Sequence, residues 1–297
     1  MPGRRKPGCD RCVRFSAPAH IMIRVKSLEK TFVAQTGGTV AALGPLDLAI
    51  ADGEFVCVVG PSGCGKSTML RILAGLERAT AGGFEIRSSP GHVDDVVTAS
   101  DARPTVASPL LVFQGDSTFP WMTVSDNVGY GLRMRGVPQK DRDADVARML
   151  AVVGLSSFGE AYPHQLSGGM KQRVALARAW VSNSPILLMD EPFGALDEQT
   201  RLSLQNQLLA IWDNDSHTFA QASSSKKTIL FVTHSIEEAI TLGDRVLVMS
   251  ERPGAIKAEI VVPFARPRDA MHLKRDPAFG ELGFKVWQLL AAGADAG

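Results

Sequence analysis

The sequence predicts an α/β protein in which helices cover a mostly parallel sheet. Short apolar runs of the kind found in strands buried on both faces lie at residues 55–59, 110–113, 186–189, 228–232 and 245–249. Helical patterns separate several of these runs, and strand–helix alternation is typical of parallel sheets. A glycine-rich loop joins the first run to a helical stretch, and four runs end in polar or glycine-rich groups. These observations place a ligand crevice at one edge of the predicted sheet.

The glycine-rich loop, residues 60–68, reads G-P-S-G-C-G-K-S-T and is called the phosphate loop below. Its pattern G-x-x-x-x-G-K-S binds nucleotide phosphates when it joins a strand to a helix. Its glycines allow positive φ angles, so that backbone N–H groups can converge on an anion at the start of the helix. Lys66 suits the β- and γ-phosphates, and the Ser67 hydroxyl suits Mg²⁺. An incidental glycine-rich turn is the alternative, and the flanking strand and helix disfavour it.

Length and charge exclude several classes of protein. The 297 residues can bury one or two cores, and 32 basic against 31 acidic residues predict no general attraction to nucleic acid. No apolar stretch approaches 18 residues, so we expect any membrane role to depend on a partner. The 4 cysteines form no disulfide framework, which favours a reducing, cytoplasmic setting.

Residues 1–20 are basic and proline-containing, and we expect a disordered arm without the apolar segment of a secretory signal. Cys9 and Cys12 form a C-x-x-C, but no second ligand pair follows at zinc-site spacing. Met22 begins the first convincing strand, so translation from either Met1 or Met22 stays open.

Further elements follow from local patterns. Strands are expected at 21–25, 39–43 and 46–50, a helix at 66–76, hairpin and loop at 77–108, an amphipathic helix at 140–153, and an exposed loop at 213–227. The helix at 140–153 carries Val146, Met149, Leu150 and Val153 on one face. The region from about 115 to 182 is predicted to be mostly helical.

Polar residues follow three further strands, at the edge where the phosphate loop is expected. Gln114 follows one strand, Asp190 and Glu191 follow another, and His234 follows a third. Asp190 suits a water-mediated Mg²⁺ contact, and Glu191 suits orientation or deprotonation of the attacking water. His234 is expected to sense the γ-phosphate, and Gln114 to complete the Mg²⁺ shell. Each residue alone also fits an ordinary structural role, but together with the phosphate loop they favour a catalytic site.

A second glycine nest occurs at residues 166–173, which read L-S-G-G-M-K-Q-R. Ser167 suits the N-cap of a helix, and Gly168 and Gly169 open its first turn. A capped helix N-terminus with two glycines is itself an anion site. A simple helix cap is the alternative, although it needs only one such residue.

With these motifs assembled, the chain from about residue 22 to residue 290 resembles ABC transporter ATP-binding subunits. Residues 166–173 are similar to the signature motif of that family, and 186–192 to its Walker B strand with catalytic glutamate. Residues 194–197 resemble the D-loop, Thr233-His234 the switch histidine and Phe113-Gln114 the Q-loop. Phe32 stands where the family stacks an aromatic ring on adenine.

The resemblance extends to the nitrate/sulfonate/taurine class of importers. It rests on residues 119–128, 192–201, 211–212 and 233–239. The chain departs from these relatives at two places: Gly115 replaces a usual acidic residue, and the segments near 90–108 and 213–226 are longer than usual.

The resemblance implies an ATPase domain of the phosphate-loop NTPase type with a RecA-like core, an antiparallel β region near its N-terminus and an inserted helical subdomain. The implied boundaries are 1–20 for the arm, 21–265 for the ATPase domain with its helical subdomain at about 115–182, and 266–297 for a helical tail. The nucleotide-binding residues would be Phe32, Gly60, Pro61, Ser62, Gly63, Cys64, Gly65, Lys66, Ser67, Thr68, Ser167, Gly168, Gly169 and Asp197. The catalytic residues would be Glu191, His234 and Gln114, and the Mg²⁺ ligands Ser67, Gln114 and Asp190.

The implied assembly is a head-to-tail homodimer with two ATP molecules between the phosphate loop of one copy and the 167–169 nest of the other. It would energise a membrane permease served by an extracytoplasmic solute-binding protein, at the cytoplasmic face of the plasma membrane. The expected docking surface is 115–131, with Trp121 either an exposed anchor or a core residue. The alternative function is a soluble ABC-type nucleotide switch, but such proteins usually fuse two ATPase halves or carry a long coiled coil.

Overall fold

The computed structural model describes residues 21–34, 37–87, 109–115, 117–182, 184–213 and 226–292. The predicted basic arm with its C-x-x-C, and most of the two long segments near 90–108 and 213–226, lie outside the described residues. No helix among the described residues combines the length and apolar character that a membrane crossing requires.

The central sheet has the order β5-β6-β7-β3-β8-β9. Its strands are β3 (Phe55–Val59), β5 (Leu110–Val112), β6 (Ile186–Asp190), β7 (Thr228–Val232), β8 (Arg245–Met249) and β9 (Ile256–Val261). All neighbours pair in parallel except β8 and β9, which are antiparallel. The predicted α/β class with a mostly parallel sheet is therefore confirmed.

Strand β3 shows how the continuous apolar runs divide the interior into two cores. Phe55, Cys57 and Val59 face the core shared with the helices that follow the phosphate-loop helix in the chain. Val56 and Val58 face a second core that lies between the central sheet and the N-terminal strands. Side chains alternate between the faces of a strand, so a strand buried on both faces needs apolar residues at every position.

A separate antiparallel sheet has the order β2-β1-β4, with β1 (Ile21–Val33), β2 (Thr39–Ala51) and β4 (Ala81–Ile86). The prediction of two short strands at 39–43 and 46–50 was wrong, because β2 runs through both. The Gly44 amide donates to Gly254 O at 3.2 Å, a tertiary bond that supports the extended chain at the expected break. The strand predicted at 21–25 likewise continues to Val33, through an irregularity near Ser27.

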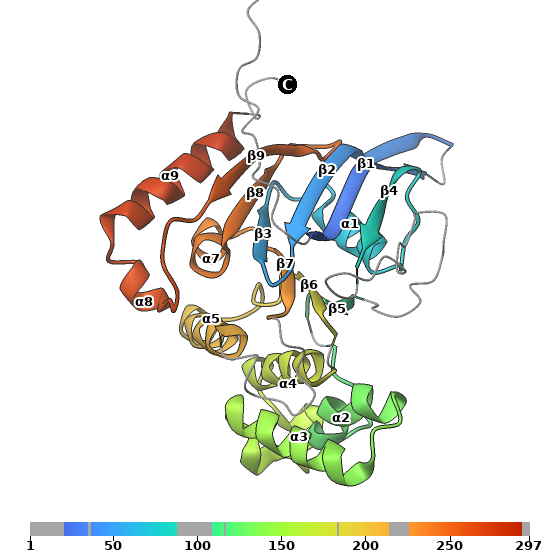
Figure 1. Ribbon diagram of the computed structural model, residues 1–297, viewed down its shortest axis with the longest axis vertical. Helices are drawn as coiled ribbons and strands as arrows, with labels where there is room; N and C mark the ends of the chain where they lie inside the picture. The colour runs from blue at the N-terminus through green and yellow to red at the C-terminus, as the bar shows by residue number, and fades with distance from the viewer. Residues whose placement is uncertain are drawn as a thin grey trace, which may run out of the picture.

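The helices are α1 (Lys66–Leu73), α2 (Val124–Met134), α3 (Gln139–Val152), α4 (Gly168–Val181), α5 (Glu198–Asp213), α7 (Ile236–Leu242), α8 (Ala270–Leu273) and α9 (Pro277–Ala291). Figure 1 shows α2 and α3 gathered at one end of the molecule, with α4 between them and the central sheet. The helix predicted at 66–76 ends early, because Gly75 has a φ of 71° and accommodates the left-handed turn that closes it. The predicted apolar face of α3 is buried, as expected.

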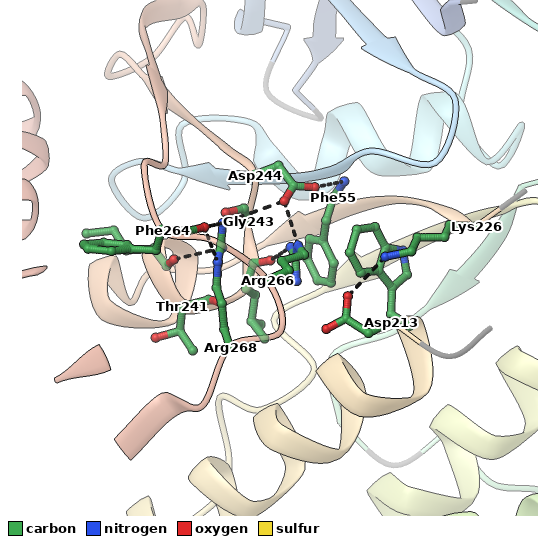
Figure 2. A network of polar contacts seen from close by, with 12 residues as sticks. Phe55, Asp213, Lys226, Thr241, Gly243, Asp244, Phe264, Arg266 and Arg268 are labelled. Carbon is green, nitrogen blue, oxygen red and sulfur yellow. Dashed lines mark hydrogen bonds and ion pairs between the residues drawn. The ribbon is translucent and has the colours of Figure 1, made fainter. Parts of the chain in front are cut away.

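The segment after β8 contains β9, α8 and α9, and the sequence patterns did not predict β9. Two arginines of this tail, Arg266 and Arg268, bind the C-terminal end of α7 (Figure 2). Arg268 Nη1 donates to Gly243 O at 2.7 Å, and Arg266 Nη2 to Leu242 O at 2.6 Å. Arg268 also donates to Phe264 O through Nε at 3.0 Å and Nη2 at 2.7 Å. The arginines therefore satisfy helix carbonyls that have no partner within the helix itself.

The same network reaches the central strand. Asp244 Oδ1 accepts from Arg266 Nε at 2.8 Å, and its Oδ2 accepts from the Phe55 amide at 3.0 Å (Figure 2). The Arg266 guanidinium also lies 4.2 Å from the centre of the Trp212 ring. Burial lowers the pKa of Arg268 to about 10, so the guanidinium stays charged near neutral pH. The tail is thus tied both to α7 and to the strand that leads into the phosphate loop.

Replacing Arg268 with alanine is expected to lower the free energy of unfolding by roughly 3 kcal/mol, because buried carbonyls lose their charged donor. The matched control is Arg275→Ala, which removes an exposed arginine from the same tail. Urea unfolding of both variants measures the difference. A loss for Arg268→Ala no larger than that of the control would contradict the structural role of the network.

Candidate functional site

The carboxyl ends of the parallel strands meet at a cleft of about 450 Å³. It is lined by Phe32, Val40, Ala42, Ser62, Gly63, Gly65, Lys66, Ser67, Thr68, Gln114, Glu191 and Arg252. Most of these residues belong to the phosphate loop or follow a strand of the central sheet. The structure therefore brings together the groups that the sequence placed at strand ends.

Lys66 is the buried cation of the phosphate loop. Its Nζ donates to Gly60 O at 2.7 Å and to Pro61 O at 2.9 Å, so the ammonium is held by the loop's own carbonyls. A bound phosphate would offer a charged acceptor in place of these neutral ones. Gly65 has a φ of 106°, and a Cβ there would lie 2.6 Å from Ala42 O, so the turn into α1 needs glycine at this position.

Ser67 and Asp190 form the part of the cleft suited to a divalent cation. Ser67 Oγ donates to Asp190 Oδ1 at 2.9 Å, which joins the first turn of α1 to the end of β6. Burial raises the pKa of Asp190, and the Ser67 hydrogen bond partly opposes that rise. No described cluster of three or more His, Cys, Asp or Glu side chains is arranged to hold a metal. One carboxylate and one hydroxyl fit Mg²⁺, which commonly takes its other ligands from nucleotide phosphates and water.

Glu191 lies beside this pair and connects three strands. Its Oε2 accepts from Gln114 Nε2 at 3.2 Å and lies 3.0 Å from His234 Nδ1. The backbone of Glu191 has a φ of 44°, in the left-handed region that residues with a side chain rarely adopt. Strained backbone of this kind concentrates at functional sites, where it aims a side chain. The carboxylate is thus held at the cleft by an amide and an imidazole.

Of the other predicted nucleotide-binding residues, Phe32 lies at the cleft and Asp197 lies outside its lining. Phe32 lines the cleft and is 39% exposed. The Lys30 Nζ lies 4.7 Å from the centre of its ring, and the rest of the ring surface is available for stacking. Asp197 lies outside the cleft lining and caps α5, because its Oδ1 accepts from the Thr200 amide at 2.9 Å. This bond, together with a second hydrogen bond from the Thr200 side chain, lowers the pKa of Asp197.

The second glycine nest is also absent from the cleft lining in this chain. Ser167 caps α4 as predicted, with its Oγ accepting from the Met170 amide at 3.3 Å. A Cβ on Gly169 would lie 2.6 Å from Thr200 Cγ2, so this glycine has a packing role that the sequence did not reveal. Gly168 has open space around its Cα, which leaves the start of α4 accessible.

Sequence reasoning missed Arg252, which follows β8. Its side chain lines the cleft and binds the carbonyl of Gly63 in the phosphate loop. The rule that found the other residues, a polar group after an apolar strand, also applies to the run at 245–249. Arg252 is the third residue after that run, so the same signal points to it.

A second hollow of about 690 Å³ lies within the helical region. It is lined by polar residues of α2, α3 and the 156–160 segment, among them Asp126, Arg133, Arg142, Asp143 and Glu160.

Trp121, just before α2, is 70% exposed, and its ring centre lies 5.7 Å from that of Phe119. Of the two interpretations of Trp121, the structure therefore supports the exposed one.

Comparison with known proteins gives consistent results. A family model described as ABC transporter matches residues 43–194. A taurine import ATP-binding protein of Rhizobium johnstonii is 41% identical over 278 residues, which cover 92% of this chain and 98% of that protein. A nitrate import ATP-binding protein of Synechocystis is 41% identical over 273 residues, 90% of this chain and 94% of that protein.

Solved structures agree with these sequence relatives. A dimeric bacterial ABC transporter cassette has a TM-score of 0.65 at 30% identity, covering 82% of this chain and all of that one (100%). A dimeric cassette in a post-hydrolysis state, bound to ADP and phosphate, has a TM-score of 0.64 at 30% identity, with 82% and 100% coverage.

Proposed function

The chain belongs to the ABC transporter family of ATP-binding proteins, and from this premise we propose that it energises an importer of a small anionic solute. ATP binding and hydrolysis are the activity of the family. The importer class is supported by about nine-tenths of the chain aligning with taurine and nitrate import subunits. The observation that carries the catalytic assignment is the position of Glu191 at the phosphate-loop cleft, in contact with both Gln114 and His234.

In the proposed site, the phosphate loop and Lys66 hold the triphosphate while Phe32 stacks on the adenine. Ser67 and Asp190 would hold Mg²⁺, which supplies charge neutralisation on the phosphates when it is bound. Glu191 would orient the attacking water and accept its proton. His234 and Gln114, which share one Glu191 oxygen, would keep that carboxylate in place.

The proposed functional unit is a head-to-tail homodimer. Ser167 and the start of α4 form a capped helix N-terminus outside the cleft lining, so one chain carries two separate anion-binding features. Pairing each cleft with the Ser167–Gly169 turn of a second copy would use both. Two solved relatives are dimeric, which supports this arrangement.

We further propose that the permease docks on the helical region. The hollow bounded by α2 and α3 has room for a segment of a partner protein, and its lining offers charges of both signs. Trp121 lies just before α2 with most of its surface exposed. Exposed tryptophans are common anchors of protein interfaces.

Trp121→Ala is expected to leave basal ATPase activity within about twofold and to lower coupled transport at least about fivefold, because an interface anchor typically contributes ~1–2 kcal/mol or more. The assay compares solute uptake and ATP hydrolysis in proteoliposomes that contain the cognate permease. Trp287→Ala on α9 is the matched control, since Trp287 is also exposed. Normal transport by the Trp121 variant would place the docking surface elsewhere.

Affinity purification of the native complex tests the importer assignment itself. Recovery of a permease together with a binding protein would support it, and a ligand screen on that binding protein would then identify the solute. Recovery of the chain as an active ATPase without any membrane partner would favour the alternative, a soluble nucleotide switch.

A further inference from the structure

The turn between β8 and β9, residues 250–255, packs directly against the phosphate loop. Gly254 donates to Ala42 O at 3.1 Å and accepts from the Gly44 amide at 3.2 Å, so β2 holds the turn from one side. On the other side, a Cβ on Gly254 would lie 1.9 Å from Cys64 O, which shows how closely the turn approaches the loop. The turn therefore needs glycine at position 254, where its backbone packs against the backbone of the phosphate loop.

Internal hydrogen bonds of the turn fix its shape. The Ser250 amide donates to Ala255 O at 2.9 Å, and Ser250 Oγ accepts from the Ala255 amide at 3.0 Å. The same hydroxyl, with its one hydrogen, lies 3.0 Å from Glu251 O and 3.3 Å from Pro253 O, both acceptors within the turn. Because hydrogen bonds close the turn at both ends, the side chains of the residues between Ser250 and Ala255 are confined to a small region of space.

Arg252 is one of the side chains in this turn, and its guanidinium binds a single atom of the phosphate loop, the carbonyl oxygen of Gly63. Its Nε donates to Gly63 O at 3.1 Å and its Nη2 to the same oxygen at 2.9 Å. Gly63 has a φ of 76°, a conformation that is available to glycine. The next amide, that of Cys64, donates to Pro61 O at 3.3 Å, so Arg252 and the loop itself hold this peptide from its two sides. The planar guanidinium suits such forked contacts, whereas lysine offers only a point charge.

We propose that Arg252 is a positioning residue for ATP binding, which fixes the phosphate loop in the shape that receives the triphosphate. The carbonyl of Gly63 and the amide of Cys64 belong to one planar peptide, so a held carbonyl also fixes the direction of that N–H. A loop ordered beforehand loses less entropy when the nucleotide binds. The inference rests on the proposed nucleotide site, and it predicts an effect on affinity rather than on the chemical step.

The test measures the KM for MgATP, the kcat and the affinity for a fluorescent ATP analogue in Arg252→Ala. We expect KM and the dissociation constant to rise about tenfold, as for the loss of a charged hydrogen bond. The kcat should stay within about twofold, because Glu191, His234 and Gln114 are untouched. Glu251→Ala, the exposed neighbour in the same turn, is the matched control and should bind the analogue normally.

Arg252→Lys separates positioning from simple charge. Lysine keeps the positive charge but lacks the two N–H donors that the guanidinium aims at Gly63 O, so we expect it to recover only part of the lost affinity for ATP. Full recovery by lysine would overturn the proposal in favour of a plain charge contact. An unchanged affinity of Arg252→Ala for the ATP analogue would also overturn the proposal. The nucleotide site itself is tested separately, by the loss of ATP binding expected for Lys66→Ala. Thermal unfolding of each variant identifies any loss that comes from misfolding.

Discussion

Lys66→Ala is expected to weaken binding of MgATP by at least roughly tenfold and to reduce hydrolysis to background. The Lys66 ammonium is buried and held by two carbonyls at the mouth of the loop, where a triphosphate would bind. A charge-assisted hydrogen bond contributes roughly 1.5–3 kcal/mol, and the same cation also stabilises charge that develops during phosphoryl transfer. Binding of a fluorescent ATP analogue and steady-state phosphate release measure the two effects.

The matched control is Lys26→Ala, which removes an exposed lysine from β1 that pairs only loosely with Glu85, at 3.4 Å. Both variants should unfold at similar temperatures if Lys66 serves mainly the nucleotide. Near-normal hydrolysis by the Lys66 variant would contradict the assignment of the phosphate loop as the ATP site.

Glu191→Gln is expected to lower the hydrolysis rate by roughly a hundredfold or more, the scale of a lost general base, while ATP still binds. The amide has nearly the shape of the carboxylate, and its oxygen can still accept from Gln114. It cannot accept a proton from water. With hydrolysis blocked, the ATP-bound form should accumulate as a dimer, visible by light scattering after size-exclusion chromatography.

Glu281→Gln on α9 serves as the control for this variant, because it changes the same group at an exposed position away from the cleft. A Glu191 variant that hydrolyses ATP at a tenth or more of the normal rate would remove Glu191 from the role of base. A variant that stays monomeric in saturating MgATP would contradict the proposed nucleotide sandwich.

Much of the fold and the core of the site followed from local sequence. The phosphate loop needs glycines and a lysine at fixed spacing, and strands buried on both faces need continuous apolar runs. Gln114, Asp190, Glu191 and His234 were found because parallel strands place their carboxyl ends at one edge. Each loop, strand and polar strand end was recognised from residues adjacent in sequence, and the general geometry of parallel sheets then brought the strand ends together.

Strand limits and long-range contacts depended on the tertiary structure. The extent of β2 is supported by Gly44 bonding to a turn some two hundred positions away, and Trp121 could be called exposed only once its neighbours were placed. The Arg252–Gly63 contact joins residues that are 189 apart in sequence, and it forms because β8 lies beside β3 in the sheet.

The sequence by itself determined that this chain is an α/β protein with a nucleotide-binding loop and a set of polar strand ends. Only the tertiary structure decided that Gln114 and His234 share one oxygen of Glu191. It also decided that Arg266 and Arg268 bind the end of α7, and that Arg252 binds the Gly63 carbonyl of the phosphate loop. The physical reason is that backbone preferences and apolar periodicity act between near neighbours. Side-chain partners are chosen by strand order and packing, which bring distant residues together.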